Sequence, residues 1–170
     1  MAINDCGFTF EQLATSILPK HFNQLKKVLL SPVRADKFVG FKTASLKALS
    51  VLERSADFPG CYVFVDALKP VYVGISRTVV KRLVQHLNAD SHYSASLVYR
   101  MAYDDFPHEM KRDQAMKDDQ FRRVFFAARE RLRRMKVATV EVHNDLELYL
   151  FEVYAAMLLD TSAWNTFRTH

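Results

Sequence analysis

Two short runs of β-forming residues, close together in the middle of the chain, constrain the fold most. Residues 61–65 and 71–74 are rich in Val, Tyr and Phe, and a Phe-Pro-Gly turn at 58–60 precedes the first run. The connection through Asp66 is too short for a helical crossover, so we expect the two runs to pair as an antiparallel hairpin. The connection is also longer than a two-residue turn, which leaves its turn type open.

The rest of the chain is predicted to be mainly helical. Hydrophobic periodicity and capping residues indicate helices near residues 8–30 (with a break near Pro19), 45–54, 78–87, 94–103, 113–135 and 145–159. Residues 137–142 alternate in the manner of a third strand. The pattern predicts an α/β (α+β) fold in which a small three-stranded antiparallel or mixed sheet is flanked by helices.

Composition excludes several classes of protein. With 49% hydrophobic residues, 4 Gly and 5 Pro in 170 residues, the chain has enough apolar material for a core and is not low-complexity. Cys6 and Cys61 are isolated, which argues against a disulfide framework and a zinc site. No Gly-rich phosphate loop is present, which argues against an NTPase.

The chain is expected to have no membrane partner and to be cytoplasmic. Its N-terminus has no cationic stretch before an apolar run, so a signal peptide is not predicted. The richest apolar run, residues 146–159, is too short to span a bilayer and contains Glu147 and Glu152.

Positive charge is concentrated in one segment. The net charge is +5, but residues 111–136 alone hold ten Lys/Arg and four Asp/Glu, a balance of +6. In the helix predicted there, one side opposite the apolar stripe carries four basic residues, Arg122, Arg129, Arg133 and Lys136. This side is a candidate nucleic-acid-binding face; the alternative is an ordinary solvated helix face.

Two further features are candidates for chemistry. Arg82 and His86 lie four residues apart in a predicted helix, a spacing that puts them on one face, where they could clasp a phosphate or simply face solvent. Glu152 has Leu148, Ala155 and other apolar residues as helical neighbours. A carboxylate in such surroundings is costly unless it binds a cation or pairs with an Arg or a tyrosine hydroxyl.

Taken in order, these features resemble the GIY-YIG nuclease superfamily over about residues 58–165. The match consists of Gly60-Cys61-Tyr62 (with Cys in place of the usual isoleucine), Tyr72-Val73-Gly74, Arg82, His86, Glu152 and Asn165. Each fragment is short, and the resemblance depends on the ordered set.

The resemblance implies a metal-dependent endonuclease that hydrolyses phosphodiester bonds in DNA, with RNA open as a substrate. Glu152 would hold Mg²⁺ or Mn²⁺, and Arg82 would stabilise charge on the phosphate. Tyr62 would orient or deprotonate the attacking water with help from His86, and Tyr72 would hydrogen-bond near the phosphate. Three residues would support the site: Gly60, Asn165 and Gly74, the last by leaving room for the phosphate.

The resemblance also divides the chain. Residues 1–57 are expected to form a helical N-terminal extension, and residues 58–170 a nuclease-like domain with a basic helical insertion at about 88–136. One active site cuts one strand, so duplex cleavage would require a homodimer or two successive nicks. The alternatives are a catalytically inactive nucleic-acid-binding module of the same fold and a purely structural or protein-interaction domain.

Overall fold

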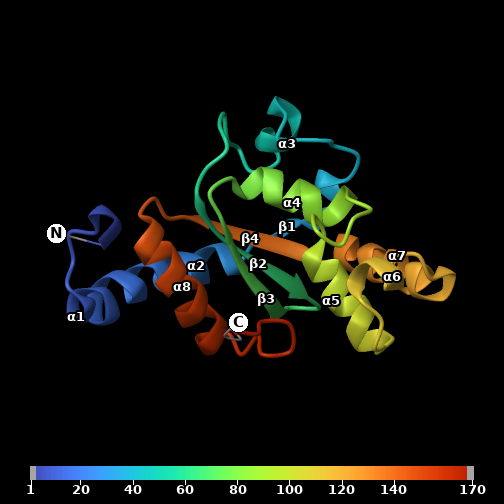
Figure 1. Cartoon of the computed structure of the whole chain (residues 1–170). Coiled ribbons are helices and arrows are strands. Elements are labelled where there is room, and N and C mark those ends of the chain that lie inside the picture. The colour runs from blue at the N-terminus through green and yellow to red at the C-terminus, as the bar shows by residue number, and fades with distance from the viewer. Residues whose placement is uncertain (1–2, 168–170) are drawn as a thin grey trace. The chain divides into compact units, whose positions relative to one another are not determined.

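The computed structural model describes residues 3–167 and shows an α/β fold around a four-stranded sheet (Figure 1). The strands are β1 (Val33–Arg34), β2 (Gly60–Asp66), β3 (Lys69–Ser76) and β4 (Lys136–Glu141), in the order β1-β4-β2-β3. The prediction of three strands was therefore wrong by one. β1 has only two residues, too few to show the alternation that reveals a strand in a sequence.

The predicted hairpin is confirmed, since β2 pairs antiparallel with β3 on one side and with β4 on the other. In the β2–β3 register, Tyr62 is opposite Gly74 and Phe64 is opposite Tyr72. Because side chains alternate along a strand, these residues belong to one face of the sheet, and Cys61, Val63 and Val73 belong to the other.

The helices follow the predicted order with changed boundaries. They are α1 (Phe10–Gln12), α2 (Leu18–Leu29), α3 (Leu46–Ser50), α4 (Val79–Asn88), α5 (Ser96–Asp105), α6 (Arg112–Ala115), α7 (Asp119–Arg134) and α8 (Asp145–Leu158). Within residues 3–167, no helix has both the length and the apolar character needed to cross a membrane.

Local chemistry explains two breaks in the helices, of which the sequence predicted the one near Pro19. A π-helical turn, Leu13–Ile17, lies between α1 and α2, and Pro19 occupies the first turn of α2. Proline lacks the amide hydrogen needed for a regular α-helical bond to the previous turn. The helix predicted at 113–135 is split into α6 and α7, because Asp118 caps a new helix by accepting a hydrogen bond from the backbone amide of Phe121 (2.8 Å).

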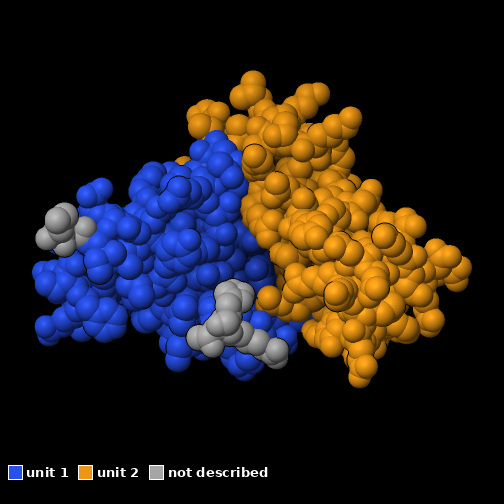
Figure 2. Space-filling model, in the orientation of Figure 1, with its two compact units in different colours: residues 1–33, 57–79, 136–170 blue, residues 34–56, 80–135 orange. Residues whose placement is uncertain are grey.

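The chain divides into two compact units, coloured separately in Figure 2. Unit 1 contains the chain up to residue 33, residues 57–79 and the chain from residue 136 onward. Unit 2 contains residues 34–56 and 80–135. The segment predicted as an N-terminal extension thus contributes to both units.

In unit 1, helices α2 and α8 cover one face of the sheet. Leu25 from α2 and Phe151 from α8 are fully buried against the sheet residues Cys61, Val63 and Val73. Asn144, one of the two residues (with Asp145) that could cap this helix, accepts hydrogen bonds from the amides of its first turn (3.0 and 3.1 Å). This helix places Glu152 in unit 1.

Candidate functional site

The tyrosine of β2 lies directly over the glycine of β3. Tyr62 is only 1% exposed, and a Cβ atom added at Gly74 would lie 2.5 Å from the Tyr62 hydroxyl oxygen. Gly74 is therefore required by the tyrosine ring. The expectation that Gly74 leaves room for a phosphate needs correction, because Tyr62 occupies the space above it.

The glycine of β2 has a similar steric reason. A Cβ atom at Gly60 would collide with the backbone carbonyl of Val140 on β4. Backbone atoms of a paired strand cannot move aside as a flexible side chain can. Both glycines of the tyrosine motif are thus explained by close packing within the sheet.

Three aromatic rings form a cluster on the sheet face that carries Tyr62. The ring centroids of Tyr62 and Tyr72 are 6.2 Å apart and tilted by 46°, and Phe64 meets Tyr62 edge-on at 6.0 Å. Tyr72 is half-buried, whereas Tyr62 and Phe64 are buried. Tyr72 is accordingly the more accessible of the two candidate catalytic tyrosines.

Glu152 is half-buried and lines a hollow of about 190 Å³ at the end of β3. The other lining residues are Ile75, Ser76, Arg77, Asp145, Leu148 and Tyr149. Arg77 pairs with the Asp145 carboxylate. The pKa of the Cys61 thiol is raised well above its usual range, first by burial and then by the negative charge of Glu152. Glu152 thus brings negative charge close to β2 from the helix side.

The oxygen atoms that line this hollow suit a hard cation such as Mg²⁺ that keeps most of its bound water molecules. Among the described residues there is no group of three or more His, Cys, Asp or Glu side chains that could enclose a metal ion. Mg²⁺ commonly binds through one or two carboxylates and completes its coordination with water and substrate phosphate. The Glu152 carboxylate, which lines the hollow together with Ser76, fits that requirement.

Asn165 joins the segment after α8 to the edge strand. Its side-chain carbonyl accepts a hydrogen bond from the Val73 amide (2.8 Å), and its side-chain NH₂ donates to the Val73 carbonyl (2.7 Å). These two bonds imitate the pairing of a neighbouring strand. They anchor the end of the chain that follows the glutamate helix to β3.

Arg82 and His86 lie on α4 in unit 2, and their surroundings differ. Arg82 donates from its two terminal nitrogens to the Ser94 carbonyl and the Ser96 hydroxyl, each at 2.9 Å, beside the start of α5. His86 is 0% exposed and is buried along with Leu83 and Leu87. An open, solvated face for this pair is therefore wrong, and the predicted phosphate clasp stays a prediction.

Burial determines the protonation state of His86. Its pKa is lowered well below the usual value, first by desolvation and second by the positive charge of Arg82. The imidazole is therefore neutral near pH 7. A neutral imidazole cannot bind phosphate as a cation, and the lowered pKa also makes it a weak base.

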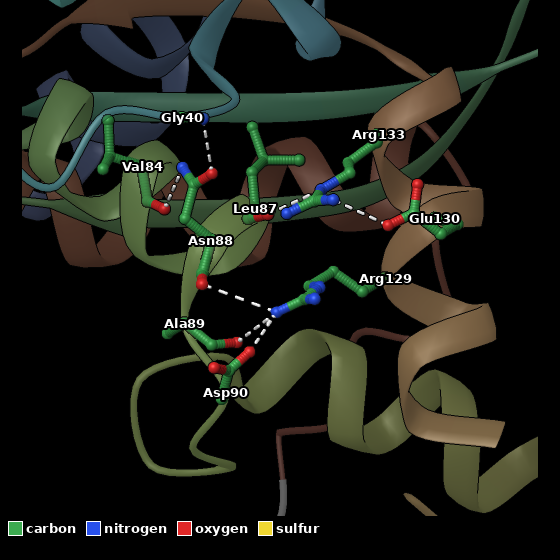
Figure 3. Close-up of polar contacts among 9 residues, drawn as sticks. All are labelled: Gly40, Val84, Leu87, Asn88, Ala89, Asp90, Arg129, Glu130 and Arg133. Carbon is green, nitrogen blue, oxygen red and sulfur yellow. Dashed lines mark hydrogen bonds and ion pairs between the residues drawn. The ribbon is translucent and has the colours of Figure 1, made fainter. Parts of the chain in front are cut away.

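Two of the four predicted nucleic-acid-binding residues instead hold the end of α4 (Figure 3). Arg133 donates from Nε to the Leu87 carbonyl (2.8 Å) and from Nη1 to Glu130 (2.6 Å). Arg129 donates to the carbonyls of Asn88 and Ala89 (3.5 and 3.4 Å) and pairs with Asp90. We call these two arginines the α4 clamp.

The other two predicted nucleic-acid-binding residues are exposed. Arg122 lies in the first turns of α7 with its side chain open to solvent. Lys136 was expected on the long helix, but α7 ends at Arg134 and Lys136 begins β4 in unit 1. The four basic residues thus do not form the continuous helical face that the sequence suggested.

The α4 clamp was missed because it depends on tertiary contacts between α7 and the last turn of α4. The only local signal is Asn88, a residue type favoured at helix C-termini. Its side chain bonds the Val84 carbonyl (2.9 Å) and accepts from the Gly40 amide (2.8 Å), as Figure 3 shows.

No protein-family model, curated protein or solved structure matches this chain. The resemblance to GIY-YIG nucleases therefore depends on the motif residues alone.

Proposed function

We propose that the chain is a metal-dependent endonuclease of the GIY-YIG type that hydrolyses phosphodiester bonds in DNA. The observation that carries the proposal is the pairing of Tyr62 with Gly74 across β2 and β3, with Tyr72 beside them. The two motif triplets thus meet as one packed arrangement in which each glycine has a steric reason. Glu152, on α8 of the same unit, supplies the carboxylate from the hollow at the end of β3, on the sheet face opposite to the two tyrosines.

Each residue of unit 1 has a chemical role in this proposal. Glu152 would hold Mg²⁺ or Mn²⁺, which would supply Lewis-acid stabilisation of the phosphate and of the leaving oxygen. The half-buried Tyr72 donates a hydrogen bond to the phosphate. Tyr62 would orient the attacking water, as the resemblance implies.

The residues of unit 2 keep the roles expected from the sequence. Arg82 stabilises the charge that develops on the phosphate. His86 would accept the proton released by the attacking water, as the resemblance implies, although its burial and lowered pKa make it a weak base. The same set of residues would act on each strand, so duplex cleavage proceeds through a homodimer or through two successive nicks.

The decisive experiment is a cleavage panel over supercoiled, linear, flapped and single-stranded DNA with Mg²⁺ or Mn²⁺. We expect Glu152→Gln, which removes the charge and keeps the size, to lower cleavage at least about a hundredfold while the protein remains folded. Glu109→Gln changes an exposed carboxylate and should cut like the wild type. Undiminished cleavage by Glu152→Gln would remove the proposed metal ligand.

A second candidate is a nucleic-acid-binding module that does not cut. The observation that favours it is the attachment of Arg82 to Ser94 and Ser96, together with the complete burial of His86. This candidate predicts salt-dependent DNA binding with no product in any divalent metal. Cleavage that is lost in Glu152→Gln would exclude it.

A further inference from the structure

Unit 2 contains an open hollow of about 550 Å³ that the proposed nuclease residues do not use. It lies where the chain after α4 meets α6 and the start of α7. The lining residues are Asp90, Ser91, His92, Tyr93, Asp113, Met116, Lys117, Arg122 and Phe126. Aromatic rings, cations and a histidine are thus gathered in one place, which we call the unit 2 hollow.

The most exposed aromatic ring in this hollow, that of Tyr93, is held in place by packing against a buried histidine. Tyr93 is 72% exposed, and its ring centroid lies 4.0 Å from that of the buried His92, with the planes tilted by 36°. The Tyr93 hydroxyl also donates to the Asp113 carboxylate (3.3 Å). A large exposed ring with a fixed orientation is a platform for stacking a flat ligand.

The charges around the platform favour an anionic group. Lys117 and Arg122 are both exposed, and the Arg122 guanidinium lies 5.8 Å from the Phe126 ring centroid. Asp90 is paired with Arg129, whereas Asp113 accepts a hydrogen bond from Tyr93 and keeps its negative charge. Lys117 and Arg122 against Asp113 leave a balance of +1 in the hollow.

One buried polar atom also lines the hollow. The His92 side chain is only 5% exposed, and its Nε2 atom makes no hydrogen bond to any described residue. Asp113 Oδ1 lies 3.5 Å away, at the limit of a direct contact. A buried polar nitrogen in this state is stabilised by a ligand atom that bonds to it.

We propose that the unit 2 hollow binds one unpaired nucleotide of a single-stranded nucleic acid. The base stacks on Tyr93, the phosphate lies against Lys117 and Arg122, and His92 Nε2 hydrogen-bonds the nucleotide. Bases in a duplex are already stacked on both faces, so only an unpaired base can use this platform. The inference rests on the proposed function in taking nucleic acid as the ligand, and it adds a preference for single-stranded segments.

The test measures binding by fluorescence anisotropy in EDTA, where no cleavage occurs. The probes are a labelled 12-nucleotide single strand and a hairpin duplex of the same sequence. We expect the wild type to prefer the single strand, Tyr93→Ala to weaken single-strand binding about tenfold, and Tyr93→Phe to keep the binding. Tyr103→Ala, an exposed tyrosine that does not line the hollow, is the matched control. Equal binding by Tyr93→Ala and the wild type would overturn the inference.

The proposed phosphate contact is tested with arginine variants and with competing small ligands. Arg122→Ala should reduce the salt dependence of binding by about one counterion, whereas its exposed neighbour Arg123→Ala should matter less. A mononucleotide should displace the strand better than inorganic phosphate does. Equal displacement by the two competitors would indicate an anion site without base stacking, and would also overturn the inference.

The two proposals fail separately. Cleavage that depends on Glu152, with single-strand binding insensitive to Tyr93→Ala, leaves the nuclease proposal standing and removes this one. Strand binding that depends on Tyr93, in a protein that cuts nothing, does the reverse.

Discussion

The contact between Gly74 and Tyr62 shows how one missing side chain can position another. Because a methyl group at Gly74 would meet the Tyr62 ring 2.5 Å away, Gly74→Ala must displace a buried tyrosine. We expect a loss of about 1–3 kcal/mol in the free energy of unfolding, measured by urea denaturation. Gly7→Ala is the control, since a Cβ atom there has no neighbour within 4 Å. Equal stability of the two variants would contradict the packing described.

His86 predicts how stability depends on pH. Its pKa is lowered in the folded protein, so below about pH 6.5 the unfolded chain binds a proton that the folded protein rejects. The contribution of His86 to stability is complete above that pH and is lost as the pH falls. The slope from this residue approaches about 1.4 kcal/mol per pH unit.

Urea titrations at pH 7.5, 6.5 and 5.5 measure that slope. In His86→Gln the slope should be smaller, because the titrating group is gone while the other histidines remain. An identical slope in the wild type and the variant would assign the acid sensitivity to other groups.

At the residue scale, the sequence singled out Tyr62 and Gly74 but did not predict the contact between them. Tyr62 and Gly74 stand out through their order along the chain. Their mutual contact depends on the strand register, which a pattern of residue types does not specify. The environment of His86 was missed because an imidazole is compatible with both a solvated face and a buried one.

Among the elements, the end of α4 is the clearest case of one helix held by another. Arg133 reaches the Leu87 carbonyl, one of the groups that a helix C-terminus leaves unpaired, and brings positive charge to the negative end of the helix dipole. Arg133→Ala should therefore cost about 1–2 kcal/mol in the free energy of unfolding.

Hydrogen exchange locates the effect of Arg133→Ala. Amides in the last turn of α4 should exchange faster in this variant, while those of α8 should not change. The exposed Arg134→Ala is the matched control on the same helix. Unchanged exchange at α4 would show that the clamp does not stabilise the helix end.

Elements with strong local signals were predicted well. The hairpin follows from β-forming residues, and α8 follows from an apolar run with Asn144 as its cap. The sequence did not predict the split between α6 and α7. Asp118 can occur within a helix, and only its capping hydrogen bond to Phe121 shows that a new helix begins there. The π-helical turn before Pro19 is equally invisible to a periodicity argument.

For the whole molecule, the first 57 residues are part of both units. Leu25 of α2 is fully buried in the core of unit 1, and Phe38 is fully buried within unit 2. A chain that begins at residue 58 should therefore lose cooperative thermal unfolding, measured by circular dichroism, and should bind a hydrophobic dye. A sharp melting transition close to that of the full chain would show that the segment is a separable extension.

The division into units also explains why the site was only partly predictable. Tyr62, Tyr72 and Glu152 belong to unit 1, whereas Arg82 and His86 belong to unit 2. Charge and spacing along the sequence indicate candidates within one helix or hairpin. They do not show that Arg129 and Arg133 are used to hold α4, which removes half of the predicted basic face.

The bonds between Asn165 and Val73 have a consequence beyond the fold of one chain. β3 is an edge strand, and an edge strand with free amides and carbonyls is a template for aggregation. The Asn165 amide occupies both backbone groups of Val73, and Pro70 on the same strand has no amide hydrogen to offer. A single asparagine thus blocks the addition of a strand from another molecule at Val73.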